Sequence, residues 1–314
     1  MVYTMQALFN IINKPMGWVL EAMAGMFGGN FAAAVFFFTL VINLVLIPLS
    51  IKSQKSSVQQ TRIKPKLDEL KKRYGDDKQK YNEAMQKLYQ EENVSLSGGC
   101  LPMILRLVIM MSIYWLIMSP LTYLMHIPND TITSAAEALN IANKGGYELA
   151  LVNAIKAGKG AGNAAVAEIA SKLGTIDFGF FGINLTETPK FSFDIFHDAQ
   201  LIWVMPVIAF LAQILSSLLS LAIQKKTNPE APNMAGMMLT MPLLSLFIGF
   251  TLPGGVAFYW ACSSLVGGVI QVLVQNFYGP HKMLSRERSK ELSKQCDFEI
   301  SQIKKLSSVS DTDK

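Results

Sequence analysis

The chain has 314 residues, of which 51% are hydrophobic and only 16% are charged, with a mean hydropathy of +0.30. Soluble globular proteins carry about 25% charged residues, so this composition excludes an ordinary soluble domain and indicates a membrane protein with several spans. The cysteines Cys100, Cys262 and Cys296 lie far apart, which argues against a disulfide framework or a metal site. The net charge is a modest +5.

The first 30 residues combine an apolar face with charged and helix-breaking positions. They lack the basic start of a secretory signal peptide. We therefore predict, for residues 1–30, an amphipathic helix that lies in the extracytoplasmic membrane interface. A short additional span is the weaker alternative, because Lys14, Pro15 and Glu21 interrupt the apolar run.

Five apolar stretches are long enough, at about 20 residues each, to cross the hydrocarbon core of a bilayer. We expect transmembrane helices at residues 31–51, 100–123, 201–223, 234–252 and 256–277. The predicted fold class is therefore an all-α membrane protein with five transmembrane helices, a cytoplasmic helical hairpin and an N-terminal interfacial amphipathic helix.

The hairpin is predicted for the polar segment 52–99. Apolar side chains recur there at helical spacing in two stretches, at Ile63, Leu67, Leu70 and Tyr74 and then at Tyr81, Met85 and Leu88. Between them, Gly75 is a candidate C-cap, and one of the two aspartates that follow it, Asp76 or Asp77, is a candidate N-cap. Two such helices would extend roughly 25 to 30 Å from the membrane. A solvated linker is the alternative, and the matching stripes around a turn disfavour it.

The distribution of basic residues predicts the orientation. Residues 52–99 hold 11 Lys or Arg and residues 279–314 hold 8, whereas residues 122–200 hold 5 against 8 acidic residues. The positive-inside rule then places the hairpin, the loop 224–233 and the tail 278–314 in the cytoplasm. With five spans, the N-terminus and the loop 124–200 are extracytoplasmic.

The long loop 124–200 has the composition of short helices joined by glycines. A capping box, with Ser134 as N-cap and Glu137 three residues later, predicts a helix that starts at Ser134. Alanine-rich stretches follow, broken at Gly145-Gly146 and between Gly158 and Gly162. We expect short amphipathic helices here.

Nothing in the sequence predicts an enzyme. His126, His197 and His281 lie in loops or in the tail, far from one another, and no expected span contains Asp or Glu. No phosphate-binding loop, metal cluster or nucleophile with a partner base is visible. We therefore expect no catalytic residues, no cofactor and no metal.

Arg106 is the most informative residue, because a charge inside a span is costly and often functional. It lies about seven residues from Gly99, roughly 10 Å from the cytoplasmic end of its span, so snorkelling to the interface is the alternative. Asn43 has a similar depth in the first span, so both could face one wet cavity that opens to the cytoplasm. The candidate residues of such a polar groove are Arg106, Asn43, Gln213, Ser217, Thr240 and Tyr259.

Six motifs, in this order along the chain, resemble YidC/Oxa-type membrane protein insertases of the short, Gram-positive-like kind. They are residues 41–49 (VINLVLIPL), 63–67 (IKPKL) with Tyr74, 93–106 (NVSLSGGCLPMILR), 224–229 (QKKTNP), Met241-Pro242 and Phe258-Tyr259-Trp260. The resemblance covers about residues 5–280, except much of the loop 124–200.

The resemblance implies a five-helix core with a hydrophilic groove that is closed outside and open to the cytoplasm and lipid. It implies a cytoplasmic-membrane insertase and chaperone that folds integral membrane proteins, alone or with the Sec translocon. The implied partners are nascent membrane proteins, the ribosome, the Sec translocon and the lipid bilayer, with no specific nucleic acid sequence and no cofactor.

The chain also departs from the family pattern. Members typically carry a groove arginine in the first span, where this chain has Asn43, and often a glutamine in the second, where it has Arg106. One positive charge is therefore kept on a different helix. The large extracytoplasmic domain of Gram-negative relatives is missing, no lipoprotein cysteine follows a signal, and the loop 124–200 is unusually long.

Two other functions are compatible with such a chain. A small-solute transporter or channel is disfavoured because the spans show no internal repeat and no acidic residue. The second is a membrane assembly chaperone that does not insert its clients, and the sequence hardly distinguishes it from an insertase.

Overall fold

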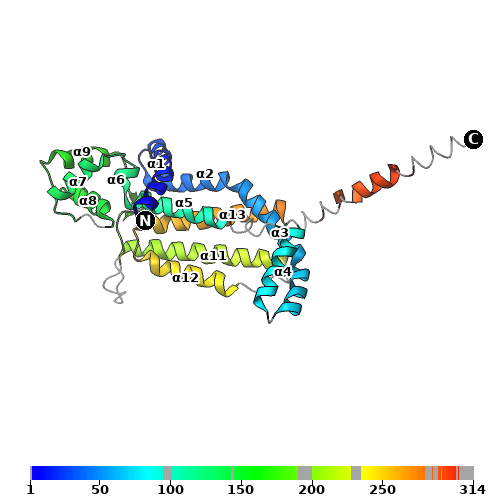
Figure 1. The fold of residues 1–314 in the computed structure, drawn as a ribbon. Helices are drawn as coiled ribbons and strands as arrows, with labels where there is room; N and C mark the ends of the chain where they lie inside the picture. Colours follow the sequence, from blue (N-terminus) through cyan, green and yellow to red (C-terminus); the bar gives the residue numbers. More distant parts are fainter. Residues whose placement is uncertain are drawn as a thin grey trace, which may run out of the picture. The chain divides into compact units, whose positions relative to one another are not determined.

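The computed structural model describes residues 2–75, 77–92, 94, 101–142, 145–189, 200–227, 235–279, 285, 289–290, 292–301 and 303. The chain divides into two compact units. The first comprises residues 1–46, 103–222 and 232–271, and the second comprises residues 47–102, 223–231 and 272–314. Figure 1 shows the helices coloured along the chain.

The first unit is built mainly from long apolar helices. They are α1 (Val2–Met26), α2 (Phe31–Val45) and most of α5 (Leu101–Met118), α11 (Val204–Thr227), α12 (Ala235–Gly249) and α13 (Gly254–Tyr278), with the short helices α6 (Pro120–Tyr123) and η1 (Leu201–Trp203). Local capping explains where α2 starts, because Asn30 Oδ1 accepts a hydrogen bond from the amide of Ala33 at 2.8 Å.

Two helices of the described chain are long and apolar enough to cross a membrane, Leu201–Ile223 and Gly254–Tyr278. A third is obtained if Phe31–Val45 and Ile47–Ser56 count as one broken span. The apolar helices Ile104–Met118 and Met238–Gly249 are shorter. The chain is thus a helical membrane protein, and the count of five spans stays a prediction.

The break in the first predicted span falls at Leu46, before the change in polarity at residue 51. Helix α2 ends at Val45, and the next helix begins at Ile47. Pro48 explains this position, because proline has no N–H to donate to the preceding turn and its ring clashes with that turn. The break between the two helices therefore lies inside the predicted span 31–51.

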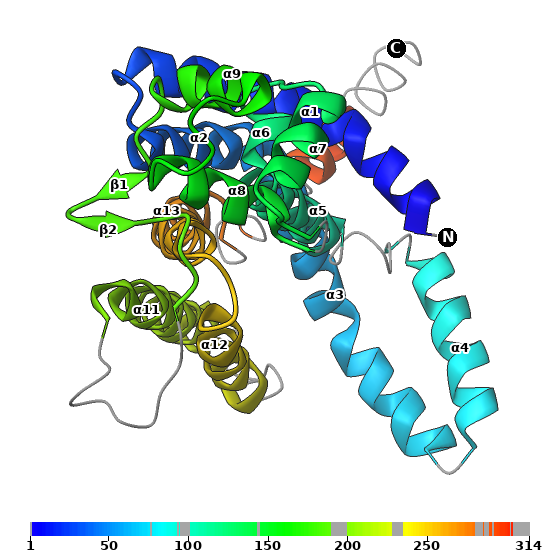
Figure 2. The same ribbon diagram turned by 90° about the vertical axis from the view of Figure 1, so that its left-hand side faces the viewer.

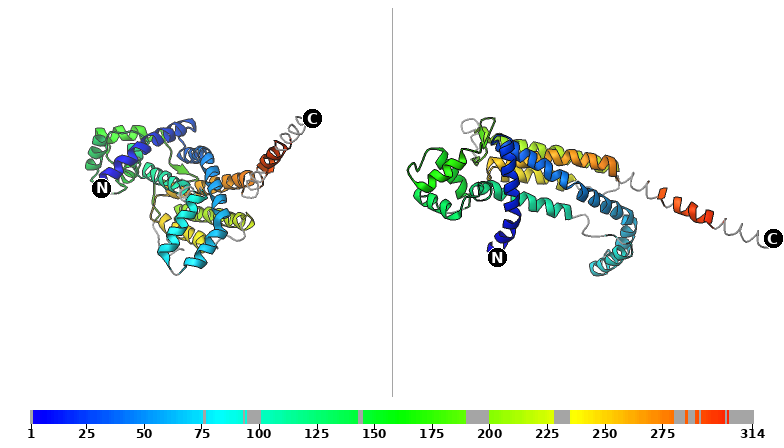
Figure 3. Two further views of the ribbon diagram at one scale, coloured as in Figure 1. Left: turned by 45° about the vertical axis from the view of Figure 1, so that its right-hand side comes forward. Right: turned by 90° about the horizontal axis from the view of Figure 1, so that it is seen from above.

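Helix α1 crosses the direction of the neighbouring helices of its unit, as the right-hand view of Figure 3 shows. Its inner face is closely packed, since a β-carbon on Gly17 would lie 2.0 Å from the carbonyl oxygen of Tyr123. Its other face leaves Ile11 73% and Trp18 61% exposed. A helix with one packed face and one exposed apolar face fits an interfacial position.

The described part of the segment 124–189, termed here the loop subdomain, has its own hydrophobic core. It contains α7 (Asn129–Ala138), α8 (Tyr147–Lys156), α9 (Ala164–Leu173) and a two-stranded antiparallel sheet of β1 (Gly179–Phe180) and β2 (Ile183–Asn184). The helices enclose Ile132, Leu151, Val152 and Ile169, which are fully buried.

Two expectations for this segment have different outcomes. Short helices are present, and the connection between α8 and α9 contains three glycines with positive φ, namely Gly158, Gly160 and Gly162. The predicted start at Ser134 is wrong, because α7 begins at Asn129 and Ser134 lies inside it. Pro128 explains the earlier start, since proline suits the beginning of a helix, where an amide has no partner.

The loop subdomain is bonded to the ends of two long helices. The amide of Asp177 donates to Gly29 O at 2.8 Å, and the amide of Phe31, the first residue of α2, donates to Asp177 O at 3.0 Å. At the start of α13, the amides of Gly254 and Gly255 donate to the carbonyls of Glu187 and Leu185, both at 2.8 Å. These hydrogen bonds tie the loop subdomain to the starts of α2 and α13.

The second unit contains α3 (Ile47–Tyr74) and α4 (Lys78–Glu91). Of the two candidate aspartates, Asp77 caps α4 by accepting a hydrogen bond from the amide of Lys80 at 3.1 Å. Hydrogen bonding to this amide lowers the pKa of the Asp77 carboxyl. Ile63 is buried, and Lys66 of α3 forms an ion pair with Glu92 at the end of α4.

Candidate functional site

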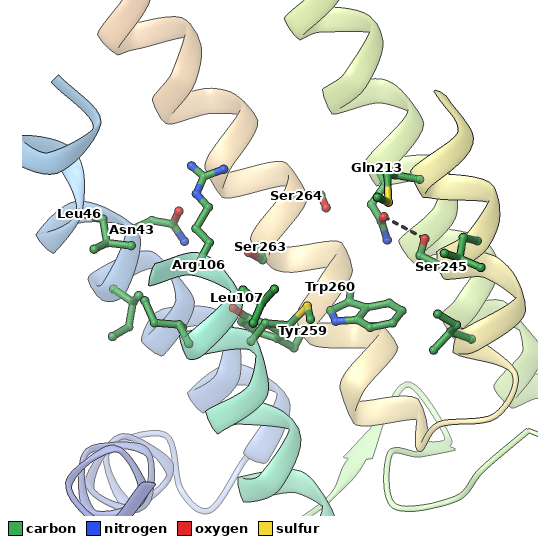
Figure 4. Close-up of a pocket in the computed structure, with 16 residues that line it drawn as sticks. Asn43, Leu46, Arg106, Leu107, Gln213, Ser245, Tyr259, Trp260, Ser263 and Ser264 are labelled. Carbon is green, nitrogen blue, oxygen red and sulfur yellow. Dashed lines mark hydrogen bonds between the residues drawn. The ribbon is translucent and has the colours of Figure 1, made fainter. Parts of the chain in front are cut away.

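A pocket of about 410 Å³ opens within the first unit, between residues of α2, α5, α11, α12 and α13 (Figure 4). Its wall is mostly apolar. The polar side chains that line it are Asn43, Arg106, Gln213, Ser245, Tyr259, Ser263 and Ser264. A largely apolar pocket with a few convergent polar groups is the usual form of a binding site.

Asn43 and Arg106 come from different helices and meet at one point on α13. A β-carbon built on Gly267 would lie 3.7 Å from Asn43 Oδ1 and 3.9 Å from Arg106 Nη2. Asn43 is 9% exposed, and its Nδ2 donates to the carbonyl of Thr39 at 2.8 Å. Its Oδ1 therefore points to the arginine side of the pocket, as Figure 4 shows.

Arg106 is the only charged side chain among the described residues that line the pocket. Within the described part of the chain, no carboxylate forms an ion pair with it. Arg106 is exposed, so water partly screens its charge, and the apolar wall of the pocket beside it limits that screening. The pocket therefore has a positive potential without a matching acid.

On the opposite wall, two polar side chains bond to each other. The Ser245 hydroxyl of α12 lies 2.9 Å from Gln213 Oε1 of α11 and 2.7 Å from its own helix at Pro242 O. Tyr259 of α13 is buried. The pocket thus has one cationic side, at α2 and α5, and one neutral polar side, at α11 and α12.

Four of the six candidate residues line this pocket: Asn43, Arg106, Gln213 and Tyr259. The other two do not. Ser217 is half-buried on α11, and Thr240 is exposed on α12 with its hydroxyl donating to Gly236 O at 2.6 Å. A hydroxyl can donate its hydrogen bond to a backbone carbonyl of its own helix. A Ser or Thr in a span therefore does not have to face a cavity.

Ser245, Ser263, Ser264 and Trp260 also line the pocket, although they were not among the candidates. The only sequence signal for the three serines is polarity within an apolar stretch. That signal is equally strong for Ser217, and only the packing of the helices separates them.

One further polar residue was missed entirely. Glu148 of α8 is 3% exposed, and its carboxylate accepts hydrogen bonds from the amides of Leu121 and Thr122 at 2.9 and 3.1 Å and from the Thr122 hydroxyl at 2.7 Å. Burial raises the pKa of Glu148, and these hydrogen bonds partly oppose the shift. Glu148 joins α8 to α6, outside the pocket.

The described residues offer no metal site, since no group of three or more His, Cys, Asp or Glu is arranged to hold an ion.

Comparison with known proteins gives consistent results. A model of the family "60Kd inner membrane protein" matches residues 22–281. A protein of Methylococcus capsulatus named "Membrane protein insertase YidC" is 42% identical over 110 residues, which are 35% of this chain and 20% of that protein. A protein of the same name from Dechloromonas aromatica is 39% identical over 108 residues, 34% of this chain and 20% of that protein.

A longer match covers most of both chains. "Membrane protein insertase YidC 2" of Listeria innocua is 25% identical over 295 residues, which are 93% of this chain and 78% of that protein. The matches to the first two relatives span about a fifth of their length. Because the family model covers most of the chain, this protein belongs to the 60Kd inner membrane protein family, the YidC/Oxa family that its motifs resemble.

Proposed function

We propose that this chain is a membrane protein insertase and chaperone of the bacterial cytoplasmic membrane, with the pocket around Arg106 as its substrate groove. The observation that carries the proposal is a guanidinium in a largely apolar pocket of about 410 Å³, with no acidic side chain among the described residues that line it. Similarity to proteins named as insertases supports it, and the family is not a classical enzyme family.

The pocket suits the costly step of insertion. A short polar tail or loop of a client loses hydration as it enters the bilayer, and the polar side chains of the pocket replace part of that hydration. Arg106 attracts acidic residues of the client, because a charge in a partly dry pocket acts over several ångströms. Clients with acidic translocated tails gain most from this attraction.

The flank of the pocket suits the next step. Met241, Leu244 and Ile248 of α12 line the pocket and are also exposed, at 55%, 53% and 39%. A hydrophobic client segment can therefore pass along this apolar flank into lipid. Its partition from water into the bilayer drives the reaction without a cofactor.

The proposal includes the orientation expected from the basic residues. Five spans place residues 1–30 and 124–200 outside, and the α3–α4 segment, the loop 224–233 and the tail 278–314 in the cytoplasm. The α3–α4 hairpin and the tail then face the ribosome, and the Sec translocon is a further partner. Removal of the residues after Lys282 should lower ribosome co-sedimentation, more strongly at low salt.

The test is insertion into vesicles that contain only this purified protein. Two clients with the same hydrophobic segment, one with an acidic tail and one with a neutral tail, are added, and protease protection of the tail is measured. We expect protection of both tails above the level of empty vesicles. Protection equal to that of empty vesicles, with the client still bound, would indicate a non-inserting assembly chaperone instead.

A further inference from the structure

The β1–β2 hairpin ends in an unusual turn. Its two turn residues, Phe181 and Gly182, both have positive φ, at 46° and 80°. Two-residue turns of this kind favour Asn-Gly or Gly-Gly, because a bulky side chain is strained in the left-handed region. Phe181 is strained there, and it is also 89% exposed.

The base of this hairpin is rigid, so its tip holds a defined position. Phe178 and Leu185, on either side of the strands, are buried, and the Leu185 amide donates to Phe178 O at 3.0 Å. The carbonyl of Leu185 also binds the start of α13 through Gly255. The base holds the tip in place, and Phe181 at this tip is strained. Such strain indicates a functional constraint on Phe181.

The hairpin lies at the end of a helix that can span a membrane. The ring of Phe180 packs on Phe258, near the start of α13, with centroids 4.7 Å apart. Helix α13, Gly254–Tyr278, is one of the two helices long and apolar enough to cross a bilayer. The rings of Phe180 and Phe181 are 4.8 Å apart, so Phe181 lies close to the first turns of α13, where that helix would enter a bilayer.

The direction of the hairpin is consistent with a position at the membrane surface. Figure 2 looks nearly along α11 and α13, and the β1–β2 hairpin extends across this line of sight, sideways and away from α13. It therefore runs roughly parallel to the membrane plane at the ends of the spans. Other aromatic rings, such as the T-shaped pair Trp203 and Phe250, occur at the ends of α11 and α12, as in the aromatic belts of membrane proteins.

We propose that Phe181 inserts into the bilayer as a lipid anchor of the hairpin, in the extracytoplasmic leaflet. A single exposed aromatic side chain on a rigid tip, beside spanning helices and outside the pocket described above, suits the acyl-headgroup boundary better than a protein partner. Lipid removes the exposed ring from water, which offsets the strain of the turn. The proposal depends on the proposed orientation only for the identity of the leaflet.

The depth of the tip can be measured directly. In a chain in which Cys100, Cys262 and Cys296 are replaced by Ala, Phe181→Cys is labelled with an environment-sensitive fluorophore, and the protein is reconstituted into phosphatidylcholine–phosphatidylglycerol vesicles. Quenching by nitroxide lipids is compared with quenching by aqueous iodide. Leu215→Cys, an exposed position of α11, is the lipid control, and Ala167→Cys, an exposed position of α9, is the aqueous control.

We expect lipid quenching at Phe181→Cys to approach that of Leu215→Cys and to exceed that of Ala167→Cys about threefold. Quenching equal to that of Ala167→Cys, with strong quenching by iodide, overturns the proposal and favours a protein partner. No client is present, so the result is independent of insertion activity. Quenchers added to the outside of vesicles with known protein orientation identify the leaflet.

A second measurement leaves Phe181 in place. A photoactivatable phospholipid in the same vesicles is crosslinked to the unmodified chain, and the adducts are mapped by mass spectrometry. Adducts are expected at residues 179–183 as well as on α11. Adducts on α11 with none at residues 179–183 would refute the anchor, whatever the behaviour of the cysteine variants.

Discussion

The pocket contains an exposed charge, Arg106, and the loop subdomain contains a buried one, Glu148, and their hydrogen-bonding surroundings are opposite. Glu148 is closed off from water, and two amides and one hydroxyl donate to it. Arg106 lines an open pocket, and within the described chain no carboxylate pairs with it. A satisfied charge stabilises a structure, whereas a charge without a partner remains available to a ligand.

Among the variants proposed here, Glu148→Ala should change stability the most. It leaves the amides of Leu121 and Thr122 without an acceptor inside the protein, which should destabilise the contact between α8 and α6 by about 3 kcal/mol. Hydrogen exchange of the amides of α7–α9 measures the loss. Glu168→Ala, at an exposed position of α9, is the matched control and should change little. Equal protection in both variants would show that Glu148 has no stabilising role.

Arg106→Ala should impair function while leaving stability nearly unchanged. We expect insertion of an acidic-tailed client to fall about tenfold, equivalent to roughly 1.4 kcal/mol of lost attraction, and that of a neutral-tailed client to fall less. Thr240→Ala, outside the pocket, is the control. Normal insertion of both clients by Arg106→Ala would favour the snorkelling interpretation.

Adding Asn43→Arg to Arg106→Ala sharpens the same argument. Both side chains reach one point beside Gly267, so the second substitution returns a positive charge to the same pocket and should restore most of the activity. Arg106→Lys should retain much of it as well, although lysine lacks the planar fork. A stably folded double variant without recovery would show that the helix carrying the charge matters, and not only its presence.

The pH dependence of the loop subdomain should be smaller. Because the pKa of Glu148 is raised above its usual 4.5, the folded state binds more protons than the unfolded state between the two pKa values. The stability of the subdomain should therefore rise as the pH falls through this window, with a slope of at most about 1.4 kcal/mol per pH unit. Hydrogen exchange, normalised for the intrinsic rates at each pH, measures it. Glu148→Gln should abolish this dependence, and an unchanged slope in that variant would assign it to another group.

The smallest effect is expected at the ion pair between Lys66 and Glu92. Both side chains are solvent-accessible, so water and salt screen the pair. Lys66→Met should leave the exchange of α4 amides almost unchanged, and α4 should open well before α11 in either protein. Strong slowing or acceleration of α4 exchange would mean that this contact matters more than exposed pairs usually do.

Several features followed from local sequence alone. The low charge and long apolar stretches identify a helical membrane protein, because backbone groups in lipid must bond within their own segment. The cap at Asp77 is also local, since an N-cap and its amide partner lie within one turn. The six motifs, taken together and in their order along the chain, indicated the family, which the family match confirms.

Other features depended on how the helices pack. Ser217 and Ser245 are chemically alike in sequence, yet only Ser245 lines the pocket. The residues that donate to Glu148 lie 26 and 27 positions away in the chain, at Thr122 and Leu121, and no helical period reports such a pairing. Hydrophobicity and capping act over one or two turns, so the sequence by itself determined the class of the protein and many of its helices. The rotation of each helix about its axis decides which polar groups meet, and only the tertiary structure determines it.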